Sequence, residues 1–170
     1  MIIHTRTGLA LAIVPATSTD LDTIISIEQK SFPTPWTRLM FEAELLGNPF
    51  SRLFLAKRRI SPDEFGEILG YICYWVVFEE LRFLNVAVNA SVRRQGIGRE
   101  LIEFAIRDGI KHEAKRALLE VRTSNPIARN MYESVGFQAY GRRKSYYTNP
   151  TEDAILMERT LLDPVHRNRP

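Results

Sequence analysis

The stretch "RRQGIGRE" (residues 93–100) combines positive charge with exposed backbone. It follows the apolar run "LRFLNVAV" (81–88) and precedes a helical pattern, so a strand is expected to lead through a glycine-rich turn into a helix. The first amides of such a helix lack intrahelical partners and, with the helix dipole, favour an anion. Gly96 and Gly98 remove the side chains that would keep a ligand off the backbone. Three arginines add charge: Arg93, Arg94 and Arg99.

A pyrophosphate would fit this turn. A plain turn with glycines at positive φ satisfies the same local pattern. The stretch lacks the G-x-G-x-x-G of dinucleotide folds and the G-K-[ST] of P-loops, which disfavours NAD and ATP as ligands.

Glu120 is a lone carboxylate inside "RALLEV" (116–121), where a buried strand would be apolar. Burial disfavours the ionised form of a carboxyl group, and a carboxyl perturbed in this way suits a general base near neutrality, acting directly or through a water. The structural alternative is an ion pair with a neighbour such as Arg122, which shares a strand face with Glu120 at i+2.

Hydrophobic periodicity predicts the elements that carry these residues. Strands are expected at 9–14, 51–57, 68–78, 81–88, 116–121, 137–147 and 153–161. Helices are expected at 18–32, at 37–48 and after the glycine turn, and a fourth begins at Asn125 and Pro126 and closes at Gly136. "PTPW" (33–36) separates the first two helices. "RRISPDEFGE" (58–67) is predicted to be a polar loop.

A meander followed by strand and helix alternation predicts one mixed α/β domain over residues 1–162 with a polar tail at 163–170. The 170 residues, 45% of them hydrophobic, can bury an ordinary core. The net charge of +3 favours acidic partners, but the dense basic blocks of nucleic-acid binders are missing. "LALAIV" (9–14) is too short for a signal peptide centre or a membrane span, so we expect a cytoplasmic protein that binds no membrane.

The cysteine and histidine content disfavours several site chemistries. Cys73 is the single cysteine and lies in an apolar strand, so we expect a buried thiol and no internal disulfide. The histidines, His4, His112 and His166, are scattered, which disfavours a metal site or a catalytic triad.

The stretch 93–100 resembles the R/Q-x-x-G-x-G/A acyl-CoA pyrophosphate loop of the GCN5-related N-acetyltransferases (GNAT). "LEVRTSNPIARNMYESVGF" (119–137) and "YYTNPTEDAILM" (146–157) are similar to the bacterial ribosomal-protein-alanine members, the RimI type. "IEQKSFPTPW" (27–36) and "FLNVAV" (83–88) match their earlier segments. The resemblance covers residues 11–160. It implies the GNAT fold, in which a mixed, mostly antiparallel central sheet flanked by helices splays to hold acyl-CoA.

The resemblance implies acetyl-CoA as donor, CoA as product and no metal. The cofactor would lie where the strand at 81–88 parts from the strand at 116–121, with the amides of Val86 and Val88 on the pantetheine arm and those of residues 94–98 on the pyrophosphate. Asn125 would touch the pantetheine arm, although a helix cap alone explains it equally well. The cofactor-binding residues so implied are Val86, Ala87, Val88, Arg93, Arg94, Gln95, Gly96, Ile97, Gly98, Arg99, Asn125 and Tyr132.

The same resemblance makes Glu120 the proposed base and Tyr132, twelve residues later, the proposed acid that protonates the departing thiolate. A core tyrosine is the competing interpretation of Tyr132. The amine would attack the thioester directly, without a covalent enzyme intermediate. Peptide binding is assigned to Pro35, Trp36, Tyr146 and Tyr147, of which the two tyrosines could also be ordinary aromatic strand residues.

An α-amine suits such a base better than lysine, because deprotonating lysine at neutral pH costs about 3.5 kcal/mol more. We therefore expect acetylation of a protein N-terminus, with the amino-terminal alanine of a small-subunit ribosomal protein as substrate. A lysine or small-amine acetyltransferase and a non-catalytic acyl-CoA-binding regulator remain alternatives. The basic run Arg142, Arg143 and Lys144 either attracts an acidic peptide or ribosomal RNA or is a solvated strand face. We do not expect direct nucleic-acid binding, and we expect a monomer or weak dimer.

Overall fold

The computed structural model describes residues 2–161 of the chain, and within it the chain forms two compact units. The first unit comprises Met1–Tyr74 and Asn85–Phe104, and the second comprises Trp75–Leu84 and Ala105–Pro170. Three elements contribute residues to both units: β4 (Glu64–Val77), β5 (Glu80–Val88) and α3 (Ile97–Lys111).

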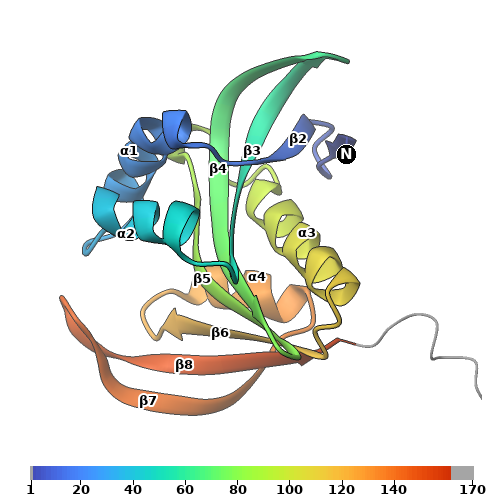
Figure 1. Ribbon diagram of the computed structural model, residues 1–170. Coiled ribbons are helices and arrows are strands. Elements are labelled where there is room, and N and C mark those ends of the chain that lie inside the picture. The colour runs from blue at the N-terminus through green and yellow to red at the C-terminus, as the bar shows by residue number, and fades with distance from the viewer. Residues whose placement is uncertain (1, 162–170) are drawn as a thin grey trace, which may run out of the picture. The chain divides into compact units, whose positions relative to one another are not determined.

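The strands of the first unit follow the chain order β1-β2-β3-β4-β5, which confirms the predicted meander (Figure 1). They start with β1 (Ile2–His4), β2 (Ala10–Pro15) and β3 (Ser51–Ser61). Strand β2 is antiparallel to both of its neighbours, pairing Ile3 with Leu11 and Ile13 with Ala56. The sequence patterns did not predict β1.

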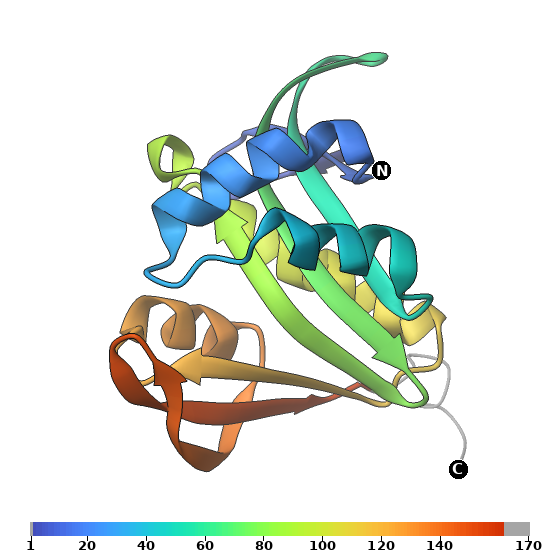
Figure 2. The same ribbon diagram turned by 60° about the vertical axis from the view of Figure 1, so that its left-hand side comes forward.

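Helices α1 (Leu21–Ser31) and α2 (Arg38–Glu42) lie in front of the strands of this unit in the view of Figure 2. A short 3-10 turn, η1 (Ser18–Asp20), precedes α1, whose Leu21, Ile24 and Ile27 are buried at the predicted helical spacing. Thr37 caps α2 by accepting a hydrogen bond from the Met40 amide at 3.3 Å. The predicted second helix continues as a π-helix, η2 (Ala43–Gly47).

The second unit orders its strands β5-β6-β8-β7, with β6 (Arg116–Arg122), β7 (Gln138–Thr148) and β8 (Thr151–Thr160). Strand β6 runs parallel to β5 over three pairs, Glu80–Arg82 with Arg116–Leu118, although both strands continue beyond them. It is antiparallel to β8 along its whole length.

Helix α4 (Pro126–Ser134) also belongs to the second unit and has the predicted boundaries. The Asn125 side chain accepts a hydrogen bond from the Ala128 amide at 3.1 Å, and Gly136 ends the turn with φ of +89°. The Phe137 ring packs edge-on against Tyr132 and Phe83, at centroid distances of 6.0 and 5.8 Å.

The prediction of a polar loop at 58–67 is wrong, because β3 extends to Ser61 and β4 begins at Glu64. One pair of charged residues there lies across the two strands, with Arg58 Nη2 at 2.9 Å from Glu67 Oε1. The backbone of a charged residue on an exposed strand can pair with the neighbouring strand just as that of an apolar residue can. Polarity alone therefore does not identify a loop. The predicted tail at 163–170 lies outside the described residues.

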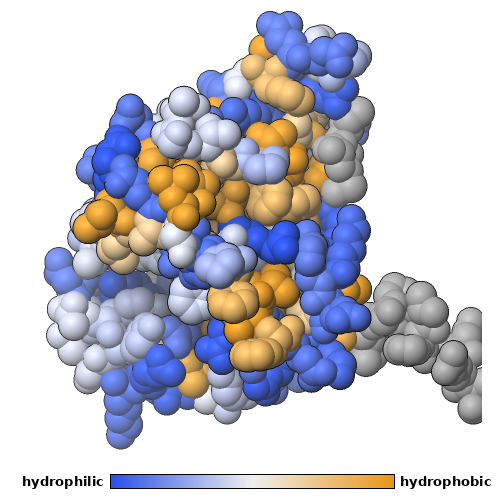
Figure 3. Space-filling model, in the orientation of Figure 1, coloured by the Kyte–Doolittle hydropathy of each residue, from blue (hydrophilic) through white to orange (hydrophobic). Residues whose placement is uncertain are grey.

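The surface mixes polar and apolar side chains, and apolar colour gathers in the region of α2 in Figure 3. The exposed large apolar residues of α2 and the segment after it are Leu39, Met40, Leu46 and Phe50. Among the helices of residues 2–161, none has the length and apolar content to cross a membrane.

Candidate functional site

The glycine turn of the first unit has the backbone that an anion site needs. A 3-10 turn, η3 (Ala90–Val92), leads into it, and α3 begins at Ile97. Gly96 has φ of +86° and Arg94 has φ of +64°, both in the left-handed region. Arg93 and Arg94 lie in a hydrogen-bonded turn, and α3 begins directly after Gly96. The first amides of α3 have no acceptor within the helix, so they can bind an anion.

The side chains of Arg93 and Arg99 already bind other residues of the protein. The Arg93 guanidinium donates to the Val88 carbonyl at 3.1 Å and to Ser31 Oγ at 3.0 Å, which ties the turn to the end of β5 and to α1. Arg99 Nε lies 2.8 Å from Glu103 Oε1, one helical turn later. Arg93 thus acts mainly as a brace of the turn, although its charge remains close to it.

A contact that the sequence patterns missed supports the same turn from the N-terminal side. Thr7 Oγ1 donates to the Gln95 carbonyl at 3.2 Å, and a Cβ built on Gly96 would lie 3.5 Å from Thr5 Cβ. The Thr5 amide donates to the Leu9 carbonyl at 3.0 Å, which closes the N-terminal turn onto itself. No motif before residue 9 indicated this contact.

The segment of β5 assigned to the pantetheine arm lies tightly against β4. A Cβ built on Gly70 would approach the Ala87 carbonyl oxygen to 2.6 Å and Val88 Cα to 3.2 Å. Real Cβ atoms do not come this close to backbone, so glycine is required at position 70. Ala87 and Val88 are thereby packed against the backbone of β4.

Pro35 and Trp36 lie between α1 and α2, and Glu28 holds this segment in place. Glu28 is 1% exposed, and its carboxylate accepts hydrogen bonds from the Trp36 amide at 2.8 Å and from Asn85 Nδ2 at 3.1 Å. The Tyr71 hydroxyl donates to the same carboxylate. Three donors compensate the cost of burying this group. The sequence carried a signal for Glu28, because it lies seven residues after Leu21 on the apolar face of α1.

Glu120 lies on the less buried face of β6, in the second unit, and its side chain is 31% exposed. Its Oε1 accepts a hydrogen bond from Arg143 Nη1 at 2.8 Å. The expectation of an isolated buried carboxylate is therefore wrong, because β6 alternates between a buried and a half-buried face. The ion pair with Arg122 is also not formed, since Arg122 Nη1 binds Glu152 Oε1 at 2.7 Å.

Tyr146 and Tyr147 are close to Glu120. A hydrogen bond to Glu120 raises the pKa of Tyr146, and burial followed by the Glu120 charge raises the pKa of Tyr147 to about 12. The two rings meet edge-on at 5.1 Å. Both hydroxyls therefore stay protonated at neutral pH and can donate or accept hydrogen bonds.

Each of these rings also carries a guanidinium over its face. Arg143 lies 4.8 Å from the Tyr146 centroid and Arg122 lies 4.0 Å from the Tyr147 centroid. The run 142–144 lies on an exposed stretch of β7, in agreement with the solvated strand face, and Arg142 Nη1 also lies 3.5 Å from Asp153 Oδ2.

Tyr132 is 7% exposed and lies on α4. Burial raises the pKa of its hydroxyl, with the nearby Tyr147 adding to the effect. The phenol is thus protonated at neutral pH, as a proton donor must be. The ring packs on Phe137, so the residue also serves the core.

The structure brings Glu120, Tyr146 and Tyr147 together within the second unit, where Asn125 and Tyr132 also lie. The turn at 93–99 belongs to the first unit, as do Pro35 and Trp36. Among the described residues, no three His, Cys, Asp or Glu side chains group so that they could hold a metal ion. Cys73 is fully buried, as predicted.

Comparison with known proteins gives one family. The sequence profile of the Acetyltransferase (GNAT) family matches residues 21–137. A Bacillus subtilis protein provisionally named a ribosomal protein bS18-alanine N-acetyltransferase is 37% identical over 142 residues, which cover 84% of this chain and 90% of that protein.

Solved structures agree with this match. The crystal structure of the ribosomal-protein-S18-alanine N-acetyltransferase from Escherichia coli superposes with a TM-score of 0.80 at 30% identity, covering 94% of this chain and 99% of that one. Arabidopsis thaliana NAA60 in complex with acetyl-CoA shares the fold, with a TM-score of 0.79 at 18% identity over 89% of this chain and 98% of that one. The chain belongs to the acetyltransferase (GNAT) family of N-acetyltransferases.

Proposed function

We propose that this protein transfers the acetyl group of acetyl-CoA to the N-terminal α-amine of a protein, with the amino-terminal alanine of the ribosomal protein bS18 as its substrate. The name shared by the Bacillus subtilis relative and the Escherichia coli structure supports this substrate. The observation that carries the proposal is the cluster of Glu120, Tyr146 and Tyr147, which offers one carboxylate and two phenols to an incoming amine.

Acetyl-CoA is supported as the donor by the backbone of the first unit. The amides of the turn at residues 94–98, where α3 begins, would bind the pyrophosphate, with Arg94 in the same turn. The amides of Val86 and Val88 would pair with the pantetheine arm in the manner of an added strand. These contacts use backbone, so they require the turn geometry at Gly96 more than any particular side chain.

The proposed reaction is a direct attack. The amine nitrogen forms a bond to the thioester carbonyl carbon, and its proton passes to Glu120, directly or through a water. The carbon–sulfur bond then breaks, and Tyr132 gives its proton to the departing thiolate. The buried phenol is protonated at neutral pH, so it carries the proton that the thiolate takes.

Four peptides test the proposal, with CoA release as the readout. Peptides starting with Ala, Ser or Met are compared with an N-terminally blocked peptide that contains lysine. We expect release with the Ala peptide and little with the lysine peptide, because the α-amine loses its proton far more readily. Preference for lysine would support the alternative acetyltransferase, and acetyl-CoA binding without release from any amine would support the non-catalytic regulator.

Substitution of Glu120 tests the mechanism in the same assay. Glu120→Gln keeps the shape of the side chain and removes the base, so kcat is expected to fall by about 10²- to 10⁴-fold. Glu133→Gln, on the exposed side of α4, is the matched control and should retain the wild-type rate. Equal rates in the two variants would remove Glu120 from the mechanism.

A further inference from the structure

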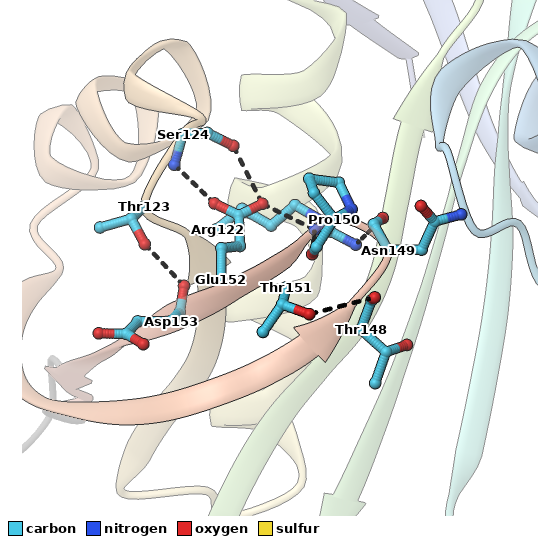
Figure 4. Close-up of polar contacts among 9 residues, drawn as sticks. All are labelled: Arg122, Thr123, Ser124, Thr148, Asn149, Pro150, Thr151, Glu152 and Asp153. Atoms are coloured by element: carbon cyan, nitrogen blue, oxygen red, sulfur yellow. Dashed lines mark hydrogen bonds and ion pairs between the residues drawn. The ribbon is translucent and has the colours of Figure 1, made fainter.

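Arg122 and Glu152 form an ion pair in the second unit (Figure 4). Arg122 is the last residue of β6 and Glu152 the second residue of β8, and their Nη1 and Oε1 atoms are 2.7 Å apart. The side chains are only 17% and 14% exposed. Such a shielded pair is held in one geometry far better than a pair on the open surface.

The remaining donors of Arg122 are aimed at the turn between β7 and β8. Its guanidinium donates to the Asn149 carbonyl at 3.3 Å and to the Pro150 carbonyl at 3.4 Å (Figure 4). The same guanidinium covers the ring of Tyr147 at 4.0 Å. Arg122 thus fixes both the turn and the aromatic ring that precedes it.

The carboxylate of Glu152 is bound to the start of α4. Its Oε2 accepts from the Ser124 amide at 3.0 Å, and its Oε1 accepts from Ser124 Oγ at 3.0 Å. Next to it, the amide and hydroxyl of Thr123 donate to the Asp153 carbonyl at 3.2 and 2.8 Å. The residue after Ser124 is Asn125, the cap of the helix that carries Tyr132.

Three segments with proposed roles in the reaction therefore meet at this pair. The β6 segment carries Glu120 two residues before Arg122, the turn follows Tyr147, and α4 carries Tyr132. Planar guanidinium geometry allows one side chain to bind a carboxylate, two carbonyls and a ring face at the same time, which lysine cannot do.

We propose that Arg122 and Glu152 are positioning residues for acetyl transfer, which hold Tyr147 and the start of α4 in position relative to Glu120. This inference rests on the proposed function, since it gives Tyr147 a part in peptide binding. The pair acts through its neighbours and touches no reacting atom.

Arg122→Lys and Glu152→Gln test this proposal by separating peptide binding from cofactor binding. A displacement of about 1 Å in a positioned group costs about 10²-fold in rate, so we expect kcat/KM for the peptide to fall by about 10- to 100-fold. The acetyl-CoA Kd, measured by calorimetry, should change less than kcat/KM for the peptide, because Arg122 contacts Tyr147 directly and the pair reaches the proposed pantetheine contact only through the helix cap at Asn125. A loss of acetyl-CoA affinity as large as the loss of kcat/KM would overturn the proposal in favour of general destabilisation.

The exposed pair Arg129 and Glu133 on α4 gives a matched control, since it has the same residue types and a distance of 2.8 Å. Arg129→Lys and Glu133→Gln should leave kcat/KM unchanged. If they lower it as much as the Arg122 and Glu152 variants do, the special role of the Arg122–Glu152 pair is refuted.

A double-mutant cycle asks whether Arg122 acts through Tyr147. If it does, the variant with both Arg122→Lys and Tyr147→Phe should lose about as much kcat/KM as the worse single variant, because coupled residues are not additive. Losses that multiply would show that the two residues act independently and would overturn the link.

Ring resonances of labelled tyrosine give a readout that needs no turnover. With the Tyr147 signals identified from Tyr147→Phe, we expect them to shift in Arg122→Lys and Glu152→Gln, and unshifted signals would refute the positioning role. If the wild type acetylates no peptide, the proposed function fails while this readout still decides the inference. If the wild type acetylates peptide and all variants match it, the inference alone fails.

Discussion

Arg143 donates a hydrogen bond from Nη1 to Glu120 Oε1 at 2.8 Å, so the proposed base is paired with a cation. An irregular register of β7 accompanies this contact: Arg143 pairs with Ala154 and Tyr147 with Glu152, so four steps along β7 match two along β8. Ser145, between them, has φ of +50°. A bulge of this kind redirects the side chains around it. The amine of a peptide would therefore compete with Arg143 for Glu120.

Arg143→Gln should relieve this competition. Partly exposed ion pairs contribute about 1 kcal/mol at most, so we expect the KM for the peptide to fall by up to about fivefold. Steady-state kinetics measure it, with Arg142→Gln as the control because its pair to Asp153 is longer, at 3.5 Å. A rise in KM would show instead that Arg143 helps to bind the peptide.

Tyr132→Phe should remove the proton donor while preserving the packing against Phe137. We expect kcat to fall by about 10²- to 10⁴-fold with little change in the acetyl-CoA Kd. Tyr140→Phe is the matched control, because Tyr140 is 54% exposed on β7. A Tyr132→Phe variant with the wild-type rate would leave only the core role for this tyrosine.

Gly70→Ala should displace β5 where the pantetheine arm is proposed to bind. The new methyl group would meet the Ala87 carbonyl, and overpacking of this kind costs about 1–3 kcal/mol in the free energy of unfolding. Urea denaturation and acetyl-CoA titration measure the two effects. Gly47→Ala is the control, since no heavy atom lies within 4 Å of its built Cβ and no loss is expected. Unchanged acetyl-CoA affinity in a destabilised Gly70→Ala variant would argue against pantetheine binding at residues 86–88.

Stability at acid pH should depend on Glu152. The hydrogen bond from Arg122 holds the pKa of the Glu152 carboxyl below its usual value of about 4.3. A carboxyl whose pKa is lowered by folding stabilises the protein above its unfolded pKa, and this contribution is lost as the pH falls through the folded pKa. Urea unfolding between about pH 6 and 3 should therefore show a shallower acid decline for Glu152→Gln than for the wild type. Equal slopes would contradict the assignment.

Cys73 should be unreactive in the folded protein. Burial raises the pKa of its thiol to about 12, with Ser51 opposing the shift and Glu44 adding to it. Because the thiolate is the reactive form, alkylation near pH 8 should be slow until urea unfolds the chain. Rapid labelling of the native protein, followed by mass spectrometry, would show that the strand opens readily.

The sequence alone determined the elements whose signals are local. Asn125, Pro126 and Gly136 specified the ends of α4 because capping and left-handed closure depend on neighbouring residues only. The turn before α3 was predictable for the same reason, since Gly96 adopts a conformation that other residues resist.

Only the tertiary structure decided which charged partners the site residues have. Glu120 pairs with a residue 23 positions away and Arg122 with one 30 positions away, through the antiparallel register of β8 with β6 and β7. No local pattern encodes that register, because it is set by the packing of whole strands and by the bulge before Tyr147. The residue types at the site can therefore be predicted from the sequence, whereas their ion pairs arise from contacts between distant segments.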